Sequence, residues 1–246
     1  MQKFALKNIV FTLALASLAT VGQAADIVRF NFNSVTADAN TATGTLSPSF
    51  GSGTASLVGG VTSTFASGDA NGGSSDLAVG DDSGWNTTGY AAATVGDKTR
   101  GVQFLVNTIG YTDIVFGYDL RHSNTSSKWE QVQYTLNGAT FTDFTQFSVT
   151  AGDVWANARL VDFTSIAGAA NNANFGVRVL STFAPTTSNY VASTTGSNYS
   201  TTGTWRFDSV SVSGNAIAAV PEPEGVLLSL AGFAALAAVA RRKAAA

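Results

Sequence analysis

The strongest constraint on the fold is an apolar side chain at every second position in five short runs. Because successive side chains of a β-strand point to opposite faces, each run places its apolar residues on one face of a sheet. Asn137 and Gly138 follow one of these runs and are typical of a hairpin turn. No segment before Pro221 keeps the spacing of an amphipathic helix, so we expect an all-β domain. The five runs are Val28, Phe30, Phe32; Val102, Phe104, Val106; Ile114, Phe116, Tyr118, Leu120; Val132, Tyr134, Leu136; and Phe175, Val177, Val179.

Strands that each have one apolar face must bury it against a second sheet. The sequence therefore predicts an antiparallel β-sandwich, of the jelly-roll kind, over residues 25–219. Residues 37–84 and 181–202 are rich in Gly, Ser, Thr and Asn, and we expect long loops or edge strands there. Trp205 shares a face with Phe207 and is expected in the core.

The first 24 residues have the three parts of a secretory signal peptide. Lys3 and Lys7 precede an apolar run at residues 9–21, and small residues lead to Ala24 and Ala25. We expect an apolar signal helix, export through the Sec translocon, and cleavage by signal peptidase after Ala24 or Ala25. The alternative is an uncleaved membrane anchor, for which the run is shorter than the ~20 residues that a span needs.

The last 27 residues, 220–246, combine three elements in order. Pro221, Glu222 and Pro223 form a stiff, extended peptide, because proline fixes φ and lacks an N–H group. An apolar stretch at residues 226–240 follows, which as a helix would be about 22 Å long and so a marginal membrane span. The basic cluster Arg241, Arg242 and Lys243 then places the tail in the cytoplasm and the large domain outside the inner membrane.

This order of elements resembles the PEP-CTERM sorting signal of Gram-negative bacteria. The resemblance implies that a membrane-embedded exosortase recognises Pro221, Glu222 and Pro223, with Arg241, Arg242 and Lys243 as the stop-transfer signal. It also implies transient anchoring in the inner membrane, and then delivery to the cell surface or to an extracellular matrix of exopolysaccharide, as in a biofilm. Glu224 and Gly225 depart from the Ser or Thr of many members, and three alanines follow the basic cluster. An ordinary tail anchor is the alternative.

Charge and composition exclude several functions. Residues 25–220 hold eight basic and 14 acidic residues, a net charge of −6, with no basic run, so we expect no nucleic-acid partner. The chain has no cysteine, which excludes thiolate catalysis and cysteine-ligated metals. The single histidine, His122, leaves no pair to hold zinc, and we expect it exposed at a strand end. Glu130 is the only glutamate of this region, so a glycosidase would need aspartates that converge in space.

Four residues are candidates for binding. Trp129 is in phase with the polar face of its strand, and an aromatic ring there could contact a sugar. Asp69 and Asp76 flank a glycine-rich segment with oxygen ligands that suit calcium, and Asp208 lies in the closing strand.

Residues 114–138 and 203–212 are similar to jelly-roll domains of exported bacterial proteins that are compared with carbohydrate-binding modules. That resemblance implies a structural calcium ion where the first and last strands meet, with Asp208 as a ligand. The leading hypothesis is a non-enzymatic surface or matrix protein that interacts with exopolysaccharide or with its own copies. The alternatives are a carbohydrate-binding module with a defined sugar site and a secreted hydrolase.

Overall fold

The computed structural model describes residues 24–76, 80–217 and 232. Residues 24–217 belong to one compact unit. The predicted signal peptide, apart from its last residue, lies outside the described residues, as do the Pro-Glu-Pro motif and the basic cluster. Among the described residues there is no helix of the length and apolarity needed to cross a membrane.

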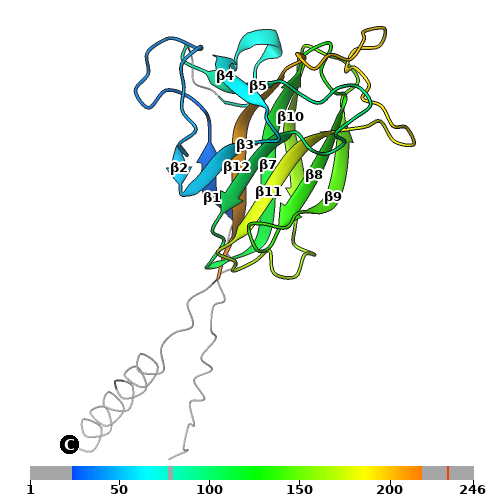
Figure 1. Ribbon diagram of the computed structural model, residues 1–246. Coiled ribbons are helices and arrows are strands. Elements are labelled where there is room, and N and C mark those ends of the chain that lie inside the picture. The colour runs from blue at the N-terminus through cyan, green and yellow to red at the C-terminus, as the bar shows by residue number, and fades with distance from the viewer. Residues whose placement is uncertain (1–23, 77–79, 218–231, 233–246) are drawn as a thin grey trace, which may run out of the picture. The chain divides into compact units, whose positions relative to one another are not determined.

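Two antiparallel sheets form a β-sandwich, as expected (Figure 1). The seven-stranded sheet has the order β10-β7-β12-β1-β2, and β5 pairs with both β12 and β4. The five-stranded sheet has the order β3-β6-β11-β8-β9. The strands are β1 (Ala24–Phe30), β2 (Phe50–Gly51), β3 (Gly53–Val58), β4 (Thr62–Ser67), β5 (Ser83–Thr88), β6 (Gly101–Val106), β7 (Tyr111–His122), β8 (Trp129–Thr135), β9 (Thr142–Ser148), β10 (Val154–Asp162), β11 (Phe175–Thr182) and β12 (Trp205–Ala216), with the short 3₁₀ helix η1 (Ala70–Gly72) between β4 and β5.

The core lies between the two sheets and consists mainly of aromatic and β-branched side chains. The alternating residues of the five runs face inward, and Tyr134 and Leu136 are the only members that are not fully buried. Trp205 is fully buried beside Phe207, with ring centroids 6.2 Å apart, which confirms its predicted place in the core. Each large apolar side chain removed from water contributes roughly 1.5–3 kcal/mol, so this layer supplies most of the stabilisation.

Residues 37–84, predicted as loops or edge strands, contain four strands. Edge strands are confirmed, since β3 and β4 each end a row of paired strands. The prediction is wrong for β5, which has strands on both sides, because the fully buried ring of Trp85 anchors it in the core. Residues 183–202 are loop, apart from one bridge between Ser127 and Ala192, as expected. The hairpin at Asn137 and Gly138 connects β8 to β9, and Gly138 adopts a φ of 74°.

The prediction of an exposed His122 is wrong. His122 ends β7, but its side chain is fully buried because it continues the inward alternation of Tyr118 and Leu120. Its Nε2 atom lies 2.9 Å from Oε1 of Glu130, and its Nδ1 atom lies 2.8 Å from the carbonyl oxygen of Ser127. Glu130 also accepts hydrogen bonds from Tyr118 (2.6 Å) and from Arg159 (3.1 Å). The only histidine and the only glutamate of the domain are thus joined in its interior.

Candidate functional site

A row of polar side chains crosses the outer face of the five-stranded sheet. Strand register places Ser56 of β3 beside Gln103 of β6, Gln103 beside Arg178 of β11, Arg178 beside Gln133 of β8, and Gln133 beside Asp143 of β9. These five positions alternate with the inward-facing core residues, so their side chains share the outer face. At about 4.8 Å per strand, the row is ~19 Å long. We call it the polar row.

Contacts among neighbours hold the polar row in place. Arg178 donates from Nε to Oε1 of Gln103 at 2.8 Å, and its guanidinium lies 3.6 Å from the centroid of the Phe141 ring. Gln133 donates to Oδ1 of Asp143 at 2.8 Å, and Lys98 forms an ion pair with the same carboxylate. Burial alone would raise the pKa of Asp143, but the hydrogen bonds from Lys98 and Gln133 lower it. The row is therefore ordered before any ligand arrives.

Trp129 lies on the same outer face as the polar row but not within it. It begins β8, four residues before Gln133, which corresponds to ~13 Å along the strand. Gln131 separates the two positions, and it is only 3% exposed because its amide is bonded to Gln146 and to backbone carbonyls. Trp129 itself is half-buried. The structure thus places the predicted aromatic residue beside the row, at its margin.

A second cluster lies at a fork in the seven-stranded sheet. Along one edge of β12, residues 205–207 pair with β5 and residues 210–215 pair with β1. Asp208 lies between these two segments, in a β-bulge, and Asp82 directly precedes β5. Asp76 approaches from the loop after η1, and the three side chains each offer an oxygen atom within 4.8 Å of the others. We call Asp76, Asp82 and Asp208 the carboxylate cluster.

The structure brings together two of the three predicted calcium ligands, Asp76 and Asp208. The third, Asp69, is exposed and stands outside the carboxylate cluster. Asp82 takes part although the sequence did not single it out. Its only signal was an aspartate immediately before a short strand, and nothing in the sequence shows that this strand meets β12.

The two inner members of the carboxylate cluster have oxygen atoms without partners. Asp82 and Asp208 are fully buried, and Asp82 Oδ1 and Asp208 Oδ2 have no hydrogen-bond partner among the described residues. Within those residues, no lysine, arginine or histidine forms an ion pair with any member of the cluster. Burial raises the pKa of Asp82 to about 6, and burial together with the charge of Asp82 raises the pKa of Asp208 to about 9.

The loop that carries Asp76 is fastened to the outer face of the sheet. The amide of Ser75 donates to Oδ2 of Asp119 at 2.5 Å, and Asn33 donates to Oδ2 of Asp76 at 2.7 Å. Farther along, Trp155 donates from its indole nitrogen to the carbonyl oxygen of Ala70 at 2.8 Å. These bonds hold the loop from several directions and orient Asp76 toward the two buried carboxylates.

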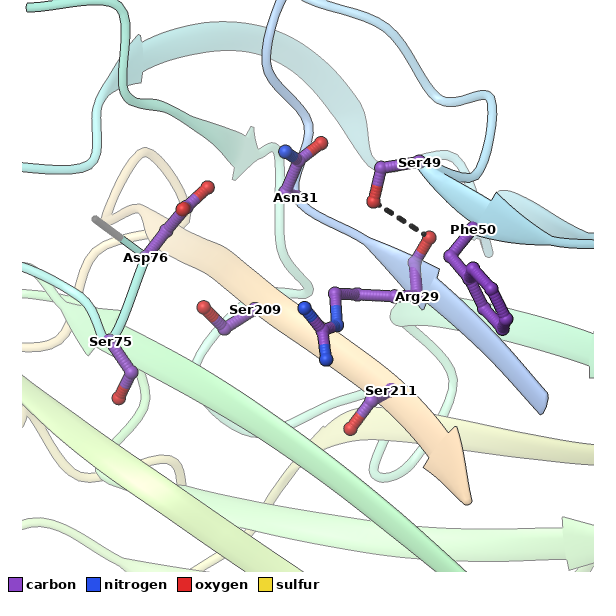
Figure 2. Close-up of a pocket in the computed structure, with 8 residues that line it drawn as sticks. All are labelled: Arg29, Asn31, Ser49, Phe50, Ser75, Asp76, Ser209 and Ser211. Atoms are coloured by element: carbon purple, nitrogen blue, oxygen red, sulfur yellow. Dashed lines mark hydrogen bonds between the residues drawn. The ribbon is translucent and has the colours of Figure 1, made fainter. Parts of the chain in front are cut away.

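Asp76 also lines a pocket of about 520 Å³ on the outer side of β1 and β12 (Figure 2). Arg29 and Ser211 come from the adjacent strands, and Ser49 and Phe50 lie on the side opposite Asp76. Ser49 donates to the carbonyl oxygen of Arg29 at 3.2 Å. The lining is mostly hydroxyl, amide and charged, so the pocket suits a polar ligand.

The carboxylate cluster does not form the cleft that a hydrolase needs. Asp82 and Asp208 are shielded from solvent, and of the three only Asp76 reaches the pocket. Glu130, the one glutamate of the domain, is enclosed by its three partners in the core. A glycosidase holds two carboxyl groups on either side of an accessible bond, and the described residues do not provide this arrangement.

No protein-family model matches the chain, and no curated protein sequence matches it. Solved structures with a similar fold include the tandem CBM22-1–CBM22-2 domain of Xyn10C from Paenibacillus barcinonensis, with 10% identity, a TM-score of 0.46, and 83% of this chain and 53% of that chain covered. The CBM22-1–GH10 modules of xylanase 10B from Clostridium thermocellum, complexed with xylohexaose, match at 12% identity and a TM-score of 0.42, covering 68% and 27%. A family 11 carbohydrate-binding module from the same organism matches at 12% identity and a TM-score of 0.36, covering 79% and 100%. The chain thus spans about half, or less, of the first two.

Proposed function

We propose that the domain is a non-catalytic glycan-binding module of an exported protein, and that the polar row is its binding surface. The observation that carries this proposal is the row itself, in which five side chains from five strands are aligned and held by mutual contacts. A flat, ~19 Å surface of this kind suits an extended polymer better than a small enclosed molecule.

The chemistry of the polar row matches that of a sugar chain. Glutamine amides offer both donors and acceptors, and the Arg178 guanidinium offers donors only, so together they can bind hydroxyl groups of either sense. Phe141 places apolar surface beneath the guanidinium, and an apolar patch among polar groups suits the C–H face of a sugar ring. Because Gln103 and Asp143 already fix their neighbours, binding would order few side chains and lose little entropy.

Export and sorting form the second part of the proposal, and they rest on the terminal segments of the sequence. The signal peptide would take the domain out of the cytoplasm, and exosortase would process it at Pro221, Glu222 and Pro223. A surface or matrix location would bring the polar row into contact with exopolysaccharide. Replacing Pro221 and Pro223 by alanine should abolish processing in the native host, and unchanged processing and location would contradict this part.

A glycan array with matched arginine variants tests the binding part. The wild-type protein should retain at least one polysaccharide, and Arg178→Ala should bind it about 10–100-fold more weakly, since a hydrogen bond from a charged group is worth roughly 1.5–3 kcal/mol. Arg29→Ala is the control, because Arg29 is an arginine on the outer side of the other sheet. Equal binding by both variants, or no retained glycan at high protein concentration, would argue against the polar row.

A further inference from the structure

The carboxylate cluster has more negative charge than its surroundings neutralise. Three carboxylates from three separate segments meet at the sheet fork, and two of them are fully buried. Taking an unpaired carboxylate out of water costs several kcal/mol, so a cluster of this kind needs protons or a cation. The cations of neighbouring arginines are engaged elsewhere, since Arg206 donates to the carbonyl oxygen of Ser67 and Arg121 pairs with Asp153.

The unpartnered oxygen atoms of Asp82 and Asp208 point to an ion in particular. Buried polar atoms are nearly always bonded, and each exception calls for an explanation such as an ion. Asp208 Oδ1 accepts from the Ser209 amide at 2.7 Å, which leaves Oδ2 free in the cluster. The hydrogen bond from Asn33 orients Asp76 in the same way. The protein thus supplies donors to the outside of the cluster and none to its centre.

From this arrangement we propose that Asp76, Asp82 and Asp208 bind a calcium ion. All three ligands are carboxylates, and calcium takes six to eight oxygen ligands. Magnesium keeps several of its water molecules and is less suited to a cluster with two fully buried members. This proposal is independent of the glycan proposal, because the cluster and the polar row belong to different sheets.

Calcium would join segments that hydrogen bonds of the sheet leave apart. Asp76 belongs to the loop after η1, Asp82 precedes β5, and Asp208 lies where β12 changes neighbours. The ion would therefore close the fork and fix the Asp76 wall of the pocket in Figure 2. Removing the ion should loosen the residue 68–82 segment first.

Calorimetric titration of the chelator-treated protein with calcium chloride tests the proposal. We expect one ion per chain, and magnesium chloride at the same concentration should bind more weakly. At calcium concentrations about 100 times Kd, the melting temperature should rise by about 5–10 °C. Asp208→Asn and Asp82→Asn should abolish both effects. Asp76→Asn, which alters the half-exposed ligand, should weaken binding in a protein that still folds.

Asp69→Asn is the matched control, because Asp69 is an exposed aspartate of the same loop that stands outside the cluster. It should bind calcium as the wild-type protein does. Absence of calcium binding in folded wild-type protein at pH 8 would overturn the proposal and leave shared protons as the stabilising device. Equal loss of binding in Asp69→Asn and Asp76→Asn would overturn the assignment of ligands. Glycan binding by Asp208→Asn separates the failure of this proposal from that of the polar row.

Discussion

Replacing Glu130 by alanine should destabilise the domain severely. The substitution removes the acceptor of three hydrogen bonds, from Tyr118, His122 and Arg159, in a site that is fully buried. Breaking a buried charge pair by removing one partner costs about 3–5 kcal/mol, because the remaining charge and donors stay buried without partners. For a domain of this size each kcal/mol lowers the melting temperature by about 2–4 °C, so we expect a decrease of about 6–20 °C.

Urea denaturation followed by tryptophan fluorescence measures this free energy of unfolding. Glu130→Gln keeps the volume and one acceptor oxygen, and should lose less stability than Glu130→Ala. Asp162→Ala is the control, because it removes an exposed acidic side chain and should change the free energy by about 1 kcal/mol or less. A Glu130→Ala protein within about 1 kcal/mol of the wild type would refute the argument that Glu130 and His122 form a structural pair.

Three further predictions follow from the same contacts. Trp129→Ala should weaken glycan binding less than threefold, or about 0.6 kcal/mol, because its ring lies ~13 Å from the polar row; a glycan array measures this. Gly203→Ala should lower the melting temperature, since a Cβ atom there would meet the Ser126 backbone at 2.5 Å; calorimetry detects this. In chelator, stability should be greatest below pH 4 and fall toward pH 6 by roughly 3 kcal/mol, because the folded state raises the pKa of Asp82; Asp82→Asn should flatten this profile in urea titrations.

The alternation of apolar residues predicted the sandwich and its core because strand faces are a local property. Phe30, Phe116 and Val177 lie where the period of two places them. The same period extends to His122, which ordinary expectations for histidine at a strand end had placed in solvent. There the inward phase of the strand outweighs the polarity of the side chain, since Glu130 and a backbone carbonyl satisfy both ring nitrogens.

The candidate sites could be predicted only in part, because both depend on which strands are neighbours. Asp76 and Asp208 were found as oxygen ligands by type, whereas Asp82 joins them only through the fork of the seven-stranded sheet. The polar row likewise arises from the register of five strands, and Arg178 has no distinguishing sequence context. Trp129 was singled out as the most conspicuous aromatic residue, but the ordered contacts lie farther along the sheet.

The most direct test of the central claim is a ¹⁵N-edited NMR titration with the glycan that the array identifies. If the polar row binds it, the largest shift changes should fall on the amides and side-chain NH groups of Gln103, Arg178 and Gln133, and they should saturate with one affinity. Shift changes confined to the pocket around Arg29 and Ser211, with the polar row unaffected at saturation, would contradict the account.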